Sequence, residues 1–189
     1  VFAARDRYGI KPFYYLQTSE FFVFSSEIPP LLSLLPGKPE PDYQSVFDYL
    51  VFNRTDHDEN TFFKRVKKLQ HGHKFLINLN SHTSVGNEGG KFLKWYDLRK
   101  QVTESQGFSS YEEFRQLLSS SIGLRLRSDV SVGVCLSGGL DSSSIVSVLL
   151  EDYQKKDLNT FSAVYSRGET GDESEFIREY SGKVCQMFY

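Results

Sequence analysis

The chain has 189 residues, 39% of them hydrophobic and 15% aromatic, so it can bury a substantial core in one or two domains. Its 22 basic and 24 acidic side chains give a formal net charge of −2, and no basic stripe indicates a nucleic-acid partner. Two distant cysteines exclude a disulfide framework, and without a membrane-length apolar run or a signal peptide we expect a cytoplasmic protein with no membrane partner.

Strands are expected in the first half of the chain. Short apolar or aromatic runs predict strands at 1–4, 13–16, 21–24, 73–80 and 91–96. A polar turn through residues 18–20 joins the second strand to the third, and the last two form a predicted hairpin across a loop rich in Ser, Asn and Gly.

Two helices and two histidine clusters interrupt these strands. A short helix is expected at 30–35, and Asp42 is placed to cap a helix that continues through Phe52. The clusters at 56–59 and 71–73 contain possible metal ligands, but a solvated loop and a turn are the commoner outcomes. We therefore assign no metal to either cluster.

A mostly polar stretch at 97–109 predicts a domain linker. Ser110 and Glu113 then form a capping box for an amphipathic helix. The apolar face predicted for that helix consists of Phe114, Leu117, Leu118, Ser121 and Ile122.

The remaining chain reads as strand, loop, helix, strand and helix. Residues 130–136 and 160–165 are apolar enough for parallel strands covered on both faces, with Cys135 as a small buried side chain. A closing helix is expected over 172–188, with Asp172 and Glu173 in the loop and cap before it. This order predicts the start of a doubly wound α/β domain, whose ligands lie beyond the carboxyl ends of the strands.

The loop at 137–143, SGGLDSS, carries the most specific chemistry. Adjacent glycines let backbone N–H groups approach an anion closely, and the serine hydroxyls add donors beside the positive end of the following helix. Asp141 would repel phosphate unless a cation lay between them, so it is the expected Mg²⁺ ligand. A Gly-Gly turn that merely caps a helix is the alternative, and a Walker A loop is excluded because its lysine is missing.

This loop and several segments before it resemble the glutamine-hydrolysing asparagine synthases. Residues 4–15 (ARDRYGIKPFYY) are similar to that family's ARDRxGIKPLYY segment, and 24–28 (FSSEI) to its FASEI. Further similar segments follow in the family's order at 49–52, 59–63, 66–69 and 72–73. Residues 70–71 depart from the family, with Gln-His where Pro-Pro is usual.

The resemblance implies an α+β part followed by an α/β part. Residues 1–96 would be the C-terminal part of an N-terminal-nucleophile glutaminase domain, 97–109 the linker, and 110–189 the start of an ATP pyrophosphatase domain. The family's glutaminase half begins with a nucleophilic cysteine, whereas residue 1 here is Val. The family's downstream SGEGSDE segment is also missing. We therefore expect an internal fragment that is inactive alone and that contains no identifiable catalytic residue.

The activity implied by the resemblance is ATP-dependent amidation of aspartate with glutamine-derived ammonia, through a β-aspartyl-AMP intermediate. The expected small molecules are aspartate, glutamine, ATP and Mg²⁺, and a homodimer of the longer enzyme is compatible with the resemblance. Asp141 would hold the metal. The residues implied to bind ATP are Leu136, Ser137, Gly138, Gly139, Leu140, Asp141, Ser142, Ser143 and Val164.

Two other functions stay open. A related enzyme, such as a β-lactam synthetase or another amidotransferase, would adenylate a different carboxylate with the same loop. A degenerate module would only bind nucleotide, although the intact SGGLDSS loop argues against degeneration.

Overall fold

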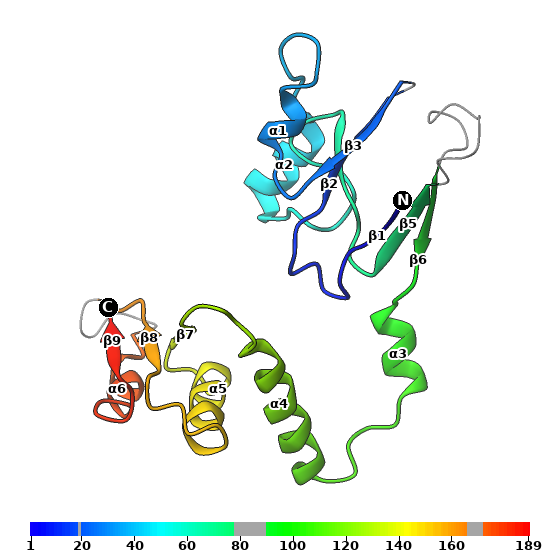
Figure 1. Cartoon of the computed structure of the whole chain (residues 1–189). Helices are drawn as coiled ribbons and strands as arrows, with labels where there is room; N and C mark the ends of the chain where they lie inside the picture. Colours follow the sequence, from blue (N-terminus) through cyan, green and yellow to red (C-terminus); the bar gives the residue numbers. More distant parts are fainter. Residues whose placement is uncertain (19, 78–89, 166–171) are drawn as a thin grey trace. The chain divides into compact units, whose positions relative to one another are not determined.

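Two compact units make up the chain, Val1–Ser105 and Gln106–Tyr189, and Figure 1 shows the elements of each. The computed structural model describes residues 1–18, 20–77, 90–165 and 172–189. Parts of the predicted turn at 18–20, of the strand at 73–80 and of the loop before residue 172 lie outside these residues. Each unit is described by itself below.

The first unit contains two three-stranded antiparallel sheets, with orders β1-β5-β6 and β3-β2-β4. Their strands are β1 (Phe2–Ala4), β2 (Tyr14–Gln17), β3 (Phe22–Ser25), β4 (Val66–Lys68), β5 (His73–Ile77) and β6 (Gly90–Lys94). The predicted hairpin is confirmed as β5 and β6. Strand β4 was not predicted, because two lysines in three residues obscure its pattern and pairing with β2 decides it.

Phe75 is the centre of the core of this unit. Its side chain is fully buried in a cluster with Leu69 and Ile77. Its ring lies 5.0 Å from that of Phe22 and 5.8 Å from that of Phe92, measured between centroids. Packing of aromatic rings at such distances contributes beyond area burial and holds strands β3, β5 and β6 together.

Helices α1 (Pro29–Leu32), α2 (Tyr43–Phe52) and α3 (Leu98–Glu104) complete the unit. As predicted, Asp42 caps α2 by accepting a hydrogen bond from the Ser45 backbone N–H at 3.0 Å. Helix α3 lies within the stretch predicted as a linker, and Asp97 caps it. The polar composition there reflects a helix whose described residues are all outside the core, rather than an irregular connection.

The second unit is built on a parallel sheet of order β7-β8-β9. Its elements are α4 (Tyr111–Arg125), β7 (Gly133–Cys135), α5 (Leu140–Glu151), β8 (Asn159–Phe161), α6 (Ser174–Arg178) and β9 (Gln186–Phe188). Ser110 caps α4 as predicted, while the Glu113 carboxylate accepts from the backbone N–H of Ser109. Strand, helix and strand alternate as the sequence predicts for an α/β domain.

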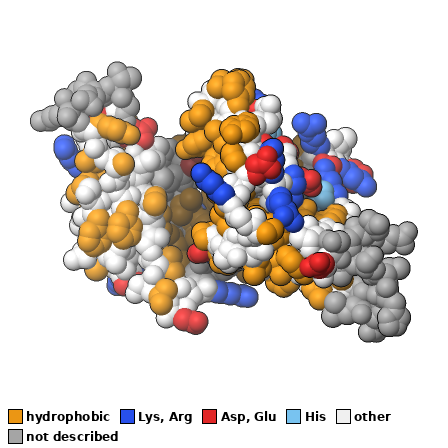
Figure 2. Space-filling model, turned by 90° about the horizontal axis from the view of Figure 1, so that it is seen from above, with side chains coloured by type: hydrophobic (Ala, Val, Ile, Leu, Met, Phe, Trp, Pro, Cys, Tyr) orange, Lys and Arg blue, Asp and Glu red, His pale blue; other side chains and the backbone are white. Residues whose placement is uncertain are grey.

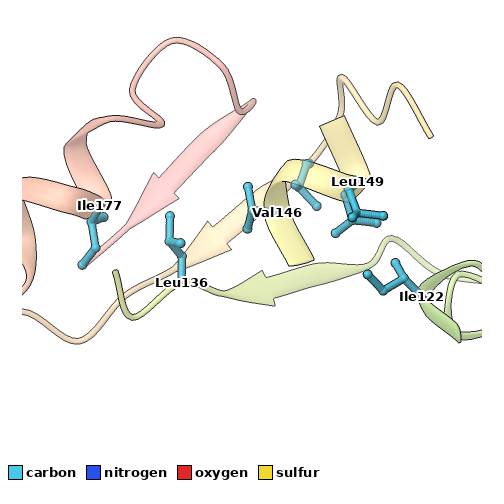
Figure 3. Close-up of a cluster of buried hydrophobic side chains, with 7 residues drawn as sticks. Ile122, Leu136, Val146, Leu149 and Ile177 are labelled. Atoms are coloured by element: carbon cyan, nitrogen blue, oxygen red, sulfur yellow. The ribbon is translucent and has the colours of Figure 1, made fainter. Parts of the chain in front are cut away.

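One hydrophobic cluster joins the helices of this unit to its sheet. Figure 3 shows Leu136 after β7, Val146 and Leu149 on α5, Ile122 on α4 and Ile177 on α6. All five are buried, and three of them belong to the chain immediately around the SGGLDSS loop. The two ends of that loop are therefore anchored in a packed core.

The prediction that the strands are covered on both faces is wrong for the described residues. Cys135 is exposed, not buried, and it lies beside Phe161 and Phe188 in the register of the three strands. The rings of Phe161 and Phe188 stack with centroids 4.9 Å apart and remain nearly half exposed. Only the opposite face, which carries Val134 and Thr160, packs against the helices.

The predicted helix over 172–188 is also wrong. Helix α6 ends at Arg178, turns follow, and Gly182 adopts a φ of +77° that a helix cannot continue through. Strand β9 then pairs with β8, and its Phe188 carbonyl accepts from the Ser162 backbone N–H at 2.8 Å. The apolar residues at helical spacing after Arg178 therefore lie in turns and in strand β9 rather than on one face of a helix.

Helix α4 buries a narrower face than its pattern indicates. Ile122 is buried and Leu118 packs partly against the core, whereas Phe114 and Leu117 are more than half exposed. Figure 2 shows hydrophobic side chains at many places on the visible surface, in keeping with the many large apolar residues that are exposed.

Candidate functional site

The SGGLDSS loop connects the carboxyl end of β7 to the first turn of α5. Leu136, just before it, is fully buried, and its backbone N–H donates to the Phe161 carbonyl at 2.8 Å. The Ser162 hydroxyl donates to the Leu136 carbonyl at 2.7 Å. These bonds continue the parallel ladder past both strands and set where the loop leaves the sheet.

Hydrogen bonds within the loop keep it curled. The Ser142 hydroxyl accepts from the Ser137 backbone N–H at 3.2 Å and lies 3.0 Å from the Ser137 hydroxyl. It also donates to the Gly139 carbonyl at 3.2 Å. The hydroxyls of Ser137 and Ser142, expected as phosphate donors, are thus bonded to each other and to the loop backbone.

Gly138 is the position at which the loop requires glycine. Its φ is +94°, and a Cβ there would lie 2.7 Å from the Cβ and 2.8 Å from the carbonyl oxygen of Glu173. Real Cβ atoms do not approach so closely, so a side chain here would displace either the loop or the start of α6. A Cβ at Gly139 would instead make only ordinary contacts of 3.5 Å or more, so the steric requirement for glycine lies at Gly138.

The first turn of α5 presents backbone N–H groups and Asp141. Gly139 is the N-cap, and no side chain caps the helix with a hydrogen bond. The Ser143 N–H bonds back to the Gly139 carbonyl at 3.1 Å, and the Ser143 hydroxyl donates to the Gly138 carbonyl. Asp141 lies exposed in this turn, where the helix dipole favours negative charge.

Tyr180 braces the helix behind the loop. Its hydroxyl donates to the Ser143 carbonyl at 3.0 Å and lies 3.0 Å from the hydroxyl of Ser147. The segment after α6 is thereby tied to the first two turns of α5. Movement of the loop relative to α6 would break this contact.

Val164 lies away from the loop glycines, past the carboxyl end of β8. It is 41% exposed and lines a cavity of about 300 Å³ together with Tyr165, Asp172, Arg178 and Tyr189. Ser174, which is buried, donates from its hydroxyl to Asp172 at 3.0 Å at the same place. The cavity lies at the edge where ligands of parallel sheets bind.

The residues around the loop suit a magnesium-bound phosphate chain. Magnesium on phosphates usually takes one or two protein carboxylates and completes its shell with water and phosphate oxygens. Asp141 offers one carboxylate, and the Glu173 oxygens lie 3.7 and 3.9 Å from the Cβ position of Gly139. Among the described residues no cluster of three or more His, Cys, Asp or Glu side chains forms, so phosphate and water would supply the other ligands.

Two of these residues were not recognised from the sequence. Glu173 is the N-cap of α6, as predicted, but its side chain makes no capping bond, and its position against the loop glycines was not predicted. Tyr180 was expected only on an apolar helix face, and its hydroxyl contact is unpredictable because it joins residues 37 positions apart.

The two units match two family descriptions. Residues 1–87 match the glutamine amidotransferase domain family, and residues 113–184 match the asparagine synthase family. The chain is therefore similar to an amidotransferase domain over its first unit and to an asparagine synthase domain over its second. With relatives aligned along nearly its whole length, it resembles a fragment of a glutamine-hydrolysing asparagine synthase.

Similar proteins include a putative asparagine synthetase (glutamine-hydrolyzing) 2 of Methanocaldococcus jannaschii, 33% identical over 94% of this chain and 33% of that protein. The asparagine synthetase (glutamine-hydrolyzing) 2 of Bacillus subtilis is 29% identical over 93% of this chain and 24% of its own length. The amidase chry2 of Gibberella zeae is 31% identical over 93% of this chain and 27% of its own length. The chain thus spans a third or less of these relatives.

Within the described parts of the chain, no helix has both the length and the hydropathy needed to cross a bilayer.

Proposed function

We propose that this chain contains the ATP-binding part of an enzyme that amidates aspartate to asparagine with ammonia from glutamine. The SGGLDSS loop carries this proposal, because it joins the carboxyl end of β7 to the first turn of α5, where anions bind in parallel sheets and where Asp141 is exposed. The site residues predicted from the sequence keep their proposed roles, from Leu136 through Ser143 and at Val164. A cytoplasmic location is part of the proposal.

The loop would hold the β- and γ-phosphates of ATP. Backbone N–H groups at the start of α5 would donate to them, and the hydroxyls of Ser137 and Ser142 would exchange their mutual bond for phosphate oxygens. Asp141 would hold Mg²⁺, with Glu173 near enough to share it. Bound there, the metal would neutralise charge on the pyrophosphate leaving group.

In the proposed reaction the side-chain carboxylate of aspartate attacks the α-phosphorus of ATP. The bond from that phosphorus to the bridging oxygen breaks, and pyrophosphate leaves with the electron pair. Ammonia then attacks the carbonyl of the resulting β-aspartyl-AMP, AMP leaves, and the amide of asparagine forms. The loop residues act in the first step, by aligning the triphosphate and stabilising the leaving group.

The first test measures binding of ATP to the chain by calorimetry, with and without Mg²⁺. We expect Asp141→Ala to abolish the magnesium-dependent part of the affinity while the urea unfolding curve is preserved, because Asp141 is exposed. Asp129→Ala, which removes another exposed carboxylate of the same unit, is the matched control. Equal Mg-ATP affinity in the Asp141 variant and the parent chain would contradict the metal assignment.

The acceptor is tested on the complete reading frame. Formation of asparagine with equimolar AMP and pyrophosphate, supported by either glutamine or ammonia, is expected. Relatives called amidases, at 31% and 33% identity, support a second candidate in which another carboxylate is activated. AMP formation that requires a different acceptor would favour that candidate, and the absence of turnover would favour a nucleotide-binding module.

A further inference from the structure

A second cavity lies in the first unit, independent of the nucleotide loop. It has a volume of about 270 Å³, and β2, α2, β4 and the loop before β4 contribute to its lining. The loop was expected to be merely solvated, but its residues 54–57 form one wall. Sites of this size fit a small metabolite.

Arg5 is one of two buried cations in the wall. Its side chain is 7% exposed and donates to the carbonyls of Lys11, Leu69 and Gly9 at 2.9–3.1 Å. A guanidinium has five N–H donors, and Nη1 makes one of these bonds. Within the described residues, the second N–H of Nη1 has no acceptor.

Lys68 is the other buried cation, at 6% exposed. Its ammonium group donates to the Thr55 carbonyl and lies 3.1 Å from a carboxylate oxygen of Asp56. The second oxygen of Asp56 lies 3.4 Å from Nη2 of Arg5. Burial raises the pKa of Asp56, but the Lys68 hydrogen bond and the charge of Arg5 outweigh it and hold that pKa below its usual value.

The charges around the cavity do not balance. Three cationic residues, Arg5, Lys68 and Arg54, line it, and among the lining residues Asp56 is the only carboxylate. Asp58, outside the lining, also interacts electrostatically with Lys68, but Asp56 and Asp58 are both substantially exposed, so the two buried cations have no buried counter-charge among the lining residues. A buried positive charge without a full counter-charge is costly, and an anionic ligand would relieve that cost.

We propose that this cavity binds a small monocarboxylate with a short hydrocarbon chain. The carboxylate would lie between Arg5, Lys68 and Arg54, where Nη1 of Arg5 offers one N–H and the exposed guanidinium of Arg54 offers planar bidentate pairing. Ile28 and Phe62 also line the cavity and provide apolar contacts that an inorganic anion cannot use. The amidation reaction above assigns no ligand to this cavity.

The test compares pentanoate with its neutral amide, pentanamide, on the 189-residue chain at low ionic strength, by ligand-observed NMR. Pentanoate is expected to bind at least about tenfold more tightly, because only it carries the charge. Arg54 is exposed at the rim of the cavity, and Arg54→Gln should weaken pentanoate binding about two- to fivefold. Arg65→Gln removes an exposed arginine that does not line the cavity and should change nothing.

Asp56→Asn gives a signature that a purely structural ion cluster would lack. It removes the competing carboxylate and should tighten pentanoate binding even as it destabilises the fold. Should that variant fail to fold, the Arg54 and Arg65 variants still decide the matter. Equal binding of the acid and the amide, unchanged affinity in Arg54→Gln, or phosphate binding as tight as pentanoate would each overturn the proposal.

Discussion

The hydroxyl of Tyr180 donates a 3.0 Å hydrogen bond to the backbone carbonyl of Ser143, the last serine of the SGGLDSS loop. This contact joins the chain after α6 to the helix that the loop begins. It makes the shape of the SGGLDSS loop depend on a residue far from it in sequence.

Removing that hydroxyl should loosen the loop. We expect Tyr180→Phe to lower the free energy of unfolding by about 1 kcal/mol, the usual net value of such a bond, and to weaken Mg-ATP binding measurably. Urea unfolding and calorimetry provide the two readings. Tyr189→Phe is the control and should change unfolding little, because the exposed Tyr189 hydroxyl makes one weak hydrogen bond, to the Met187 sulfur at 3.6 Å, among the described residues. Full ATP affinity in Tyr180→Phe would show that the brace is unnecessary for binding.

A substitution at Gly138 should lower the free energy of unfolding more than the loss of the Tyr180 hydroxyl does. Gly138→Ala should destabilise the chain by about 2 kcal/mol or more, because strain at φ +94° adds to a collision with Glu173. The same substitution at Gly37 meets nothing within 4 Å at a φ of +77° and should cost about 1 kcal/mol. Thermal or urea unfolding compares the two. Similar losses at both positions would mean that Glu173 moves aside easily.

Thr160 offers a stabilising substitution. It is fully buried in β8, and its hydroxyl has no hydrogen-bond partner among the described residues. Thr160→Val keeps the shape and removes the unpaired hydroxyl, so it should raise the free energy of unfolding by about 1 kcal/mol. Thr61→Val is the contrasting case, because the Thr61 hydroxyl donates to the Val66 carbonyl at 2.7 Å. Thr61→Val should therefore lose stability. A loss of stability in Thr160→Val as well would contradict the conclusion that the Thr160 hydroxyl is unpaired among the described residues.

Because of the buried Tyr15, the chain should lose stability in alkaline solution. Burial, together with the charge of Glu59, raises the pKa of Tyr15 to about 12 from an ordinary 10.0. The folded chain therefore keeps a proton that the unfolded chain releases, so this contribution is complete below pH 10 and is lost as the pH rises to about 12. The shift corresponds to about 3 kcal/mol. Unfolding of the parent chain and of Tyr15→Phe from pH 8 to 12 should diverge above pH 10, and parallel curves would refute the shift.

Local sequence patterns predicted the parts of the fold that local interactions form. The caps at Asp42 and Ser110 occur as expected, because a side-chain oxygen and a nearby backbone N–H need no distant partner. The hairpin of β5 and β6 and the loop between β7 and α5 follow from alternating side chains and paired glycines. The candidate nucleotide site was predictable for the same reason, since most of its residues are contiguous.

The sequence by itself therefore determined the SGGLDSS loop, its flanking strand and helix, and the strand β8 that follows them. The tertiary structure alone decided that residues 186–188 form a strand, because pairing with β8 outweighs the helical spacing of the apolar side chains. It also decided that Glu173 and Tyr180 contact the loop, and that Arg5 and Lys68 share Asp56 beside one cavity. Such contacts depend on how the chain folds back on itself, and no local pattern encodes the distance between them.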